Sequence, residues 1–169
     1  DKAVKRLNKA LGEKEKILIY GDYDVDGTTA VSLVYKYLRA YTSNLDYYIP
    51  DRYDEGYGIS TKGIDYAAEQ GVTLIISLDC GIKAIDKIEY AKGKGIDFII
   101  CDHHLADDVL PDAVAVLDAK REDSRYPYEH LSGCGVGFKF MQAFAADNGF
   151  PFSELEKLLE LTAVSIASD

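Results

Sequence analysis

The sequence lacks tryptophan and contains only one methionine, three cysteines and four prolines in 169 residues. Cys80, Cys101 and Cys134 are odd in number and show no C-x-x-C spacing, which indicates neither a disulfide framework nor a zinc knuckle. No apolar run approaches the roughly 20 residues that a membrane-spanning helix requires. These shortages favour a protein of the reducing cytoplasm with no membrane segment.

Basic residues are also scarce. The chain has 19 Lys and Arg against 29 Asp and Glu, which gives a formal net charge of -10 at pH 7. This balance argues against a broad electrostatic surface for nucleic acid, because domains of that kind usually carry a basic face. It does not exclude a nucleic-acid substrate, since bound metal ions would neutralise several of the acids and a separate basic domain would hold the strand.

The composition and the hydrophobic pattern predict a single folded α/β domain. Hydrophobic residues make up 47% of the chain, which excludes disorder. Apolar runs of strand length alternate with helical patterns, which predicts an open, mainly parallel sheet of about five strands flanked by helices. The expected strands are 17–20, 45–49, 73–78, 96–101 and 113–117, and the expected helices are 28–41, 60–70, 83–94 and 136–148, with others before Leu11 and from Ser153 onward.

Acidic and imidazole groups follow three of the expected strands, and another acid stands at position 169. In an open parallel sheet, the residues just past the carboxyl ends of the strands line one crevice, so we expect these groups to converge. Three carboxylates within five residues repel one another unless a cation lies among them. The pattern therefore predicts a divalent-metal site formed by Asp22, Asp24, Asp26, Asp79, Asp102, His103, His104 and Asp169.

Each motif taken alone has another interpretation. The segment 22–27 resembles the start of an EF-hand calcium loop, but the twelfth position of that loop is Leu33 and not the required Glu. Its acids also suit the start of a helix, where the dipole favours negative charge, although one Asp would suffice for that role. Asp79 alone fits a phosphoacceptor or a turn residue ahead of Gly81, and vicinal histidines also occur as simple surface residues.

The order of these motifs along the chain resembles that of the DHH phosphoesterase superfamily, over nearly the whole sequence. Further runs are similar to the RecJ branch of single-strand-specific exonucleases, above all Glu-Gly-Tyr-Gly at 55–58 and Gly-x-Gly-Val-x-Phe-Lys at 133–139. Manganese pyrophosphatases and small-oligonucleotide phosphodiesterases of the superfamily typically carry a His where this chain has Tyr20, which suits the RecJ branch. The chain departs from its apparent relatives at two places: Cys101 precedes Asp-His-His where a small residue such as Thr is common, and Asp118-Ala119 stands where an Asn-Pro is common.

Chemistry and resemblance together predict two divalent ions, Mn²⁺ as the first choice and Mg²⁺ as the alternative, with Asp79 bridging them. The expected metal ligands are Asp24, Asp26, Asp79, His103 and Asp169. Three further residues are expected to act beside the ions: Asp22 as a helper ligand, Asp102 as the group that orients the imidazoles, and His104 at the scissile phosphate. Lys83 and Arg121 are expected to be surface charges, whereas the expected substrate-binding residues are Arg52, Tyr57 and Lys139.

The resemblance implies a hydrolase: the core of a single-stranded-DNA-specific 5′-to-3′ exonuclease that releases 5′-mononucleotides in DNA repair and recombination. One alternative is a phosphodiesterase of short oligonucleotides or cyclic dinucleotides, and another is a non-catalytic scaffold. Residues 1–169 are expected to form one DHH catalytic domain excised from a longer protein, with DHH-associated and OB-type domains outside it. We expect such a fragment to bind metal but to cut DNA poorly. Its expected partners are single-stranded DNA and, through the longer protein, a single-strand-binding protein or a helicase.

Overall fold

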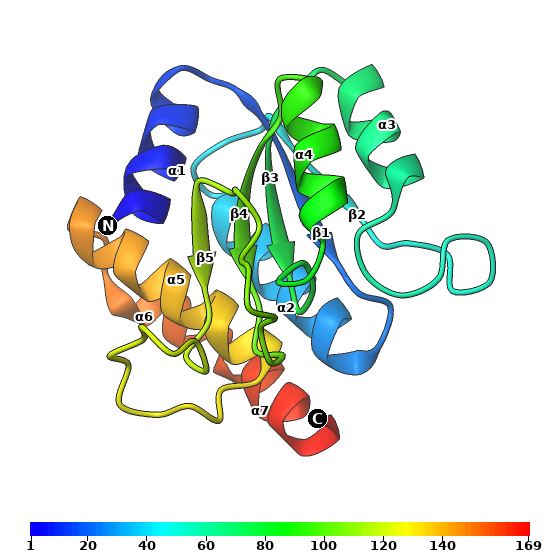
Figure 1. Ribbon diagram of the computed structural model, residues 1–169. Coiled ribbons are helices and arrows are strands. Elements are labelled where there is room, and N and C mark those ends of the chain that lie inside the picture. The colour runs from blue at the N-terminus through cyan, green and yellow to red at the C-terminus, as the bar shows by residue number, and fades with distance from the viewer.

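Five strands form one sheet in the order β2-β1-β3-β4-β5, and every neighbouring pair is parallel. The computed structural model describes residues 1–169. The sheet confirms the predicted fold class, and the arrowheads in Figure 1 all point to the same edge. The strands are β1 (Lys16–Gly21), β2 (Leu45–Tyr48), β3 (Val72–Leu78), β4 (Asp97–Cys101) and β5 (Ala115–Leu117).

Helices cover both faces of the sheet. On one face lie α3 (Thr61–Glu69) and α4 (Ile85–Gly93), and on the other lie α1 (Lys2–Gly12), α2 (Val25–Leu38) and α5 (Gly133–Asn148) (Figure 1). Two shorter helices complete the chain. The helix α6 (Phe152–Glu156) packs on α5, and α7 (Leu159–Ser168) packs on α2 and α5.

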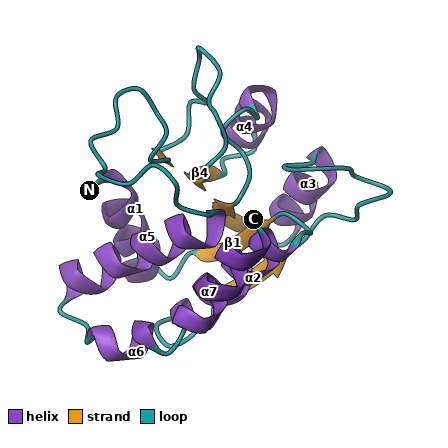
Figure 2. Cartoon of the chain, turned by 90° about the horizontal axis from the view of Figure 1, so that it is seen from below, coloured by secondary structure: helices purple, strands orange, loops and turns teal.

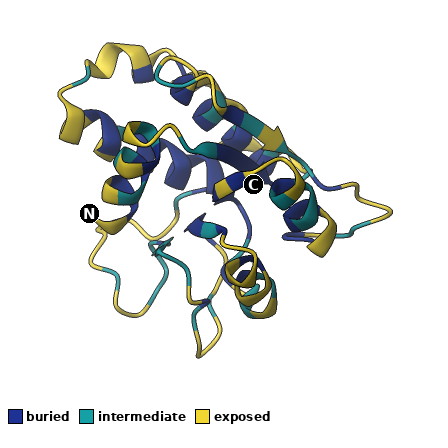
Figure 3. Ribbon diagram, turned by 90° about the horizontal axis from the view of Figure 1, so that it is seen from above, coloured by how far each residue is buried: buried dark blue, intermediate teal, exposed yellow.

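Alternation along the strands divides the core between the two faces. Ile17 and Ile19 of β1 belong to the cluster under α1, α2 and α5, whereas Leu18 and Tyr20 belong to the cluster under α3 and α4. This is the period of two that a pleated strand imposes. The central strands are therefore buried on both sides, as is usual in parallel sheets, and they form the dark layer in the middle of Figure 3.

The start of α2 differs from the prediction. The sequence pattern predicts a helix from 28 with Asp26 on the loop before it, but the helix begins at Val25 and Asp26 lies in its first turn. The reason is local, because the Asp24 carboxylate accepts a hydrogen bond from Gly27 N at 2.8 Å and so caps the helix. The predicted cap of α3 is confirmed, since Ser60 Oγ accepts from Gly63 N at 2.8 Å.

The helices after β5 also differ from the expected pattern. The helix α5 begins at Gly133, three residues before the expected start, because Ser132 caps it and accepts from Gly135 N at 3.1 Å. Glycines disfavour helix, so propensity does not indicate this first turn. The single helix expected from Ser153 is divided into α6 and α7, and both Leu155 and Leu158 at this break are buried in the core.

No helix of this structure has both the length and the apolar character that crossing a membrane demands.

Truncation of a central core residue should destabilise this fold strongly. Ile76 is fully buried on β3 and pairs with Ile19 on one side and Ile99 on the other. We expect Ile76→Ala to lower the free energy of unfolding by about 2–5 kcal/mol, through lost burial and the cavity left behind. Val164→Ala, at a position that is 51% exposed on α7, should change it by no more than about 0.5 kcal/mol. Urea denaturation measures both, and equal effects would contradict the assigned core.

Candidate metal centre

The carboxyl ends of β1, β3 and β4 deliver their acids to one edge of the sheet. Asp22, Asp79 and Asp102 each follow a strand directly. Backbone bonds extend the sheet to these positions, since Asp79 N donates to Cys101 O at 2.9 Å and Asp102 N donates to Leu117 O at 3.0 Å. Figure 2 looks at this edge and shows the C-terminus beside β1 and the start of α2. The structure therefore brings the scattered motifs together as the strand positions predicted.

His103 lies at the centre of this cluster. Its Nε2 atom is 3.1 Å from Asp79 Oδ1, 3.6 Å from Asp26 Oδ2 and 3.7 Å from Asp169 Oδ1. Asp79 Oδ1 nevertheless has no hydrogen-bond partner of acceptable geometry. Neighbouring ligands of an octahedral ion lie roughly 3 Å apart when each is 2.0–2.1 Å from the metal. The four side chains therefore face one another as ligands of a common ion would.

Three groups of potential ligands lie side by side at this edge. The ligand atoms of Asp26, His103 and Asp169 all lie within 4.8 Å of one another, and so do those of Asp22, Asp24 and Asp79. The third group, Asp79, His103 and His104, shares a residue with each of the other two and joins them. Such an arrangement suits two ions with Asp79 between them.

Buried oxygens without partners show that this edge fits a cation. Four buried side-chain oxygens lack a hydrogen-bond partner, and three of them belong to carboxylates that follow strands: Asp22 Oδ2, Asp79 Oδ1 and Asp118 Oδ2. An unpaired buried carboxylate is costly unless a positive charge lies beside it. Oxygen ligands with one imidazole match Mn²⁺ or Mg²⁺ better than Zn²⁺, which prefers thiolates or several histidines.

The backbone of Asp79 is held in a conformation that residues other than glycine rarely adopt. Its φ is +61°, and such left-handed backbone at a non-glycine residue costs about 1–3 kcal/mol. The first residue of α5 packs directly against it, since a Cβ atom on Gly133 would lie 2.6 Å from the Asp79 Cβ. Burial raises the pKa of Asp79 to about 7, and the charges of Asp26 and Asp24 add to this while His103 opposes it. The residue therefore ionises poorly unless a cation is near.

Asp26 is anchored by the start of α5. Gly133 N donates to its Oδ2 at 2.6 Å, and Cys134 N donates to its Oδ1 at 2.8 Å. A third donor is Ser165 Oγ on α7, which is 2.7 Å from Oδ1. Carboxylates are stabilised by amides at a helix N-terminus, so α5 offsets the burial of this acid.

Asp102 organises the two histidines. Its Oδ1 accepts from His103 N at 2.7 Å and lies 2.7 Å from His104 Nδ1, and its Oδ2 accepts from Ile82 N at 2.9 Å. Burial opposes ionisation, but the bonds from His104 and Ile82 N outweigh it and hold the pKa of Asp102 below its usual range. The same bond to Asp102 raises the pKa of His104. His104, whose side chain is 45% exposed, therefore keeps its positive charge to a higher pH than a free imidazole does.

An aromatic group borders the acids on the side of the loop between β2 and α3. Tyr57 is 55% exposed, and its hydroxyl lies 3.2 Å from both Asp79 O and His104 Nε2. The Tyr23 ring meets the Tyr57 ring edge-on at 6.5 Å, and the Arg52 guanidinium lies over the Tyr23 ring at 5.4 Å. Two of the three expected substrate-binding residues, Arg52 and Tyr57, thus lie together beside the site.

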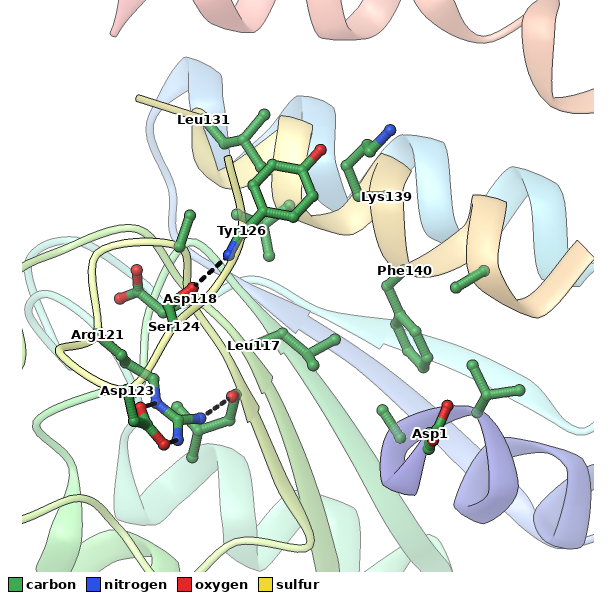
Figure 4. Close-up of a pocket in the computed structure, with 16 residues that line it drawn as sticks. Asp1, Leu117, Asp118, Arg121, Asp123, Ser124, Tyr126, Leu131, Lys139 and Phe140 are labelled. Carbon is green, nitrogen blue, oxygen red and sulfur yellow. Dashed lines mark hydrogen bonds and ion pairs between the residues drawn. The ribbon is translucent and has the colours of Figure 1, made fainter. Parts of the chain in front are cut away.

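Lys139 lies apart from this group. Its ammonium donates to Gln142 Oε1 at 2.6 Å and lies 6.0 Å from the centre of the Tyr126 ring. It lines a cavity of about 370 Å³ between α1, β5 and α5, most of whose lining residues are hydrophobic. Figure 4 shows the Lys139 side chain on α5, near Tyr126. The structure therefore does not bring Lys139 together with the acids. The two expected surface charges have local partners, because Lys83 pairs with Asp107 at 3.2 Å and Arg121 with Asp123 at 2.6 Å.

Two polar residues at this edge carried no assignment from the sequence. Ser165 is fully buried and binds Asp26, and its only signal in the sequence is its place one helical turn before Asp169. Asp118 follows β5 and is 8% exposed. Burial, and then the charge of Asp102, raise the pKa of Asp118. Two features of the sequence could have identified Asp118: its position directly after a strand, and its place where relatives commonly carry an Asn.

The metal-free chain should become less stable as Asp79 ionises. The pKa of Asp79 is about 7 in the folded chain against an ordinary value of 3.8, so the unfolded chain loses this proton first. The loss of folding stability caused by ionising Asp79 is absent below pH 4, grows up to about pH 7 and persists above it. In chelator at pH 8, we expect Asp79→Asn to raise the free energy of unfolding by roughly 2–4 kcal/mol, and at pH 4 to leave it nearly unchanged.

Denaturant titrations at the two pH values measure this difference. Asp108→Asn, at an exposed loop position, is the matched control and should have little effect at either pH. An Asp79→Asn chain less stable than the original at pH 8 would contradict the assigned cost of burying this carboxylate.

Comparisons with known proteins agree with this geometry. The model of the DHH family, N-terminal domain, matches residues 16–166. The single-stranded-DNA-specific exonuclease RecJ of Bacillus subtilis (strain 168) is 39% identical over 167 residues, which cover 99% of this chain and 20% of that protein. The protein of the same name from Escherichia coli (strain K12) is 37% identical over 180 residues, with 100% of this chain and 31% of that protein covered.

Solved structures give the same result. The crystal structure of exonuclease RecJ bound to manganese superposes with a TM-score of 0.79 at 30% identity, covering 88% of this chain and 38% of that one. The structure of RecJ in complex with Mn²⁺ from Thermus thermophilus gives a TM-score of 0.80 at 25% identity, over 96% of this chain and 23% of that one. These matches confirm the resemblance to the RecJ branch, and by the match to its family model over 16–166 the chain belongs to the DHH family.

Proposed function

We propose that this chain is the catalytic core of a metal-dependent exonuclease that hydrolyses single-stranded DNA from the 5′ end and releases mononucleotides. The observation that carries the proposal is the set of three carboxylate oxygens within 3.7 Å of His103 Nε2. The relatives named as single-stranded-DNA-specific exonucleases support it. The chain spans about a fifth to a third of their length, so the activity of the whole protein is part of the proposal.

The proposed cofactor is a pair of Mn²⁺ ions, with Mg²⁺ as the alternative. The support is the oxygen-rich donor set, the unpaired buried carboxylate oxygens, and relatives solved with manganese and with Mg²⁺. When bound, such ions supply positive charge that makes a water molecule more acidic and neutralises charge developing on the phosphate oxygens. The proposed ligands are Asp24, Asp26, Asp79, His103 and Asp169, with Asp79 shared and Asp22 assisting.

His104 is proposed to bind the phosphate that is cut. Asp102 fixes its ring through Nδ1, which leaves Nε2 directed towards the Tyr57 hydroxyl on the open side of the site. Because the bond to Asp102 raises the pKa of His104, the ring carries a positive charge over a wider pH range. A fixed cation of this kind stabilises the extra negative charge of the transition state.

The aromatic group beside the site is proposed to bind the DNA strand. Tyr57 and Tyr23 offer ring surfaces on which bases stack, and stacking is worth about 1–3 kcal/mol per base without regard to sequence. Arg52 lies over the Tyr23 ring, where it adds a donor for a phosphate. Lys139 is left out of this surface, because its ammonium binds Gln142 beside a separate cavity.

The proposal includes a setting for the longer protein. Residues 1–169 act as one catalytic DHH domain, and DHH-associated and OB-type domains elsewhere in the protein hold the strand. We place the protein in the cytoplasm, in DNA repair and recombination, with a single-strand-binding protein or a helicase as its partner. The strongly acidic composition supports the need for a separate strand-binding domain, because net charge of this sign repels DNA.

Hydrolysis of 5′-labelled single-stranded DNA by the longer protein tests the activity, because residues 1–169 alone are expected to cut DNA poorly. We expect Mn²⁺-dependent release of labelled mononucleotides, no release in chelator, and a loss of at least about a hundredfold in Asp79→Ala, because this change removes the shared ligand. A dinucleotide substrate is assayed in parallel. Cleavage of the dinucleotide alone would assign the protein to the short-oligonucleotide phosphodiesterases, and metal binding without any cleavage would favour the non-catalytic scaffold.

Removal of the Arg52 side chain should weaken DNA binding. We expect Arg52→Ala to lower the affinity for a phosphorothioate oligonucleotide about tenfold and to reduce the salt dependence by about one phosphate contact. Arg39→Ala is the matched control, because Arg39 also lies over a tyrosine ring, that of Tyr35 at 5.6 Å, but at the far end of α2. Fluorescence anisotropy at several salt concentrations measures both. Equal losses in the two variants would contradict the proposed role of Arg52.

A further inference from the structure

A chain of hydrogen bonds leads from the start of α5 to Asp26. Gly135 N donates to Ser132 Oγ at 3.1 Å, Ser132 Oγ lies 2.5 Å from Ser165 Oγ, and Ser165 Oγ lies 2.7 Å from Asp26 Oδ1. Both hydroxyls are buried, Ser132 at 3% exposure and Ser165 at 0%. Bulk water therefore competes little with these contacts.

The direction of every bond in this chain is determined. An ionised carboxylate only accepts hydrogen bonds, so Ser165 must donate its single hydroxyl proton to Asp26. Ser165 therefore has no proton left for Ser132, and Ser132 must donate to Ser165. All donors point towards the carboxylate, which is the alignment in which successive hydrogen bonds strengthen one another.

These contacts leave Asp26 with one free position for a ligand. Its two oxygens offer about four lone-pair sites in all. Cys134 N and Ser165 Oγ occupy both sites on Oδ1, and Gly133 N occupies one site on Oδ2. The remaining site belongs to Oδ2, which is the oxygen 3.6 Å from His103 Nε2. Ser165 and Cys134 N together fill Oδ1, so that only Oδ2 of Asp26 has a lone pair free for the ligand cluster.

The same serine joins two of the acids at this edge. Asp169 follows Ser165 by one helical turn, and its backbone N–H donates to Ser165 O at 3.0 Å. Asp169 and Asp26 both approach His103, although Asp26 and Ser165 stand 139 residues apart in the chain. Ser165 is the residue through which α7 contacts the carboxylate of α2.

We propose that Ser165 is a positioning residue that commits Asp26 to bind metal through Oδ2 alone and sets the place of Asp169 relative to it. This inference rests on the proposed function, because it concerns the same metal centre. Removal of a partner that orients a metal ligand typically lowers metal affinity about 10- to 100-fold. Without the Ser165 hydroxyl, Oδ1 gains a free lone pair and the carboxylate is held only by the N–H groups of Gly133 and Cys134.

Mn²⁺ titration of the chain tests this role without any assay of activity. We expect Ser165→Ala to weaken at least one of the two Mn²⁺ sites about tenfold or more in calorimetry, and to alter the electron paramagnetic resonance signal of the coupled ion pair. Thr162→Val is the matched control. Thr162 lies on the same helix and is also buried, but its hydroxyl faces Cys134 Sγ at 3.8 Å rather than Asp26. Its Mn²⁺ affinity should equal that of the original chain.

A third variant separates positioning from folding. Ser165→Cys keeps a side chain of similar size but offers only a weak donor, so its Mn²⁺ affinity should fall between those of Ser165→Ala and the original chain. If Ser165→Ala does not fold, the comparison of Ser165→Cys with the original chain provides the test. The role of Ser165 is overturned if the Mn²⁺ affinity is unchanged in Ser165→Ala or Ser165→Cys, or if Thr162→Val lowers it equally. Either result leaves the proposed function standing. No Mn²⁺ binding by the original chain overturns both.

Discussion

The crowding of buried carboxylates at one edge of the sheet is the constraint on which the rest of the site depends. Asp22, Asp79 and Asp102 are each about 1% exposed, and each comes from a different strand. Burial and mutual repulsion both oppose their ionisation. The three carboxylates differ in their surroundings. Asp102 accepts hydrogen bonds from several donors, whereas Asp22 and Asp79 each keep an oxygen without a partner. Of these three acids, one is satisfied by donors within the protein and two are completed by a cation.

The glycine-rich start of α5 makes this crowding tolerable. Gly133 approaches Asp79 so closely that any side chain would collide with it, and its N–H group binds Asp26. Glycine weakens a helix, yet here it lets the positive end of the helix dipole reach the acids. Gly27 in α2 allows a close approach of a different kind, since a Cβ atom there would lie 2.4 Å from the backbone carbonyl oxygen of Asp22. Helix propensity is thus given up at two places where a helix start must pack against the acidic segments.

The sequence predicted the sheet and the convergence of the acids, because both depend on local patterns. Apolar runs mark the buried strands, and parallel strands place the residues that follow them at a common edge. The partners of Asp26 depend instead on contacts between segments more than 100 residues apart, such as those with Gly133 and Ser165. The direction in which the Lys139 side chain points likewise depends on which face of α5 packs on the sheet. The motif at 133–139 does not indicate that face.

The loop between β2 and α3 connects the proposed strand-binding surface to the metal centre. Glu55 accepts hydrogen bonds from Tyr48 Oη at 2.9 Å and from Asp51 N at 2.9 Å, which fixes the loop against the sheet. Beyond it, Gly58 N reaches Asp22 Oδ1 at 3.4 Å and the Tyr57 hydroxyl reaches Asp79 O. A base that stacks on Tyr57 therefore contacts a residue tied to the backbone of the central acid. In so acidic a chain, the proposed function assigns recognition of the strand to aromatic rings and a few local donors instead of a basic surface.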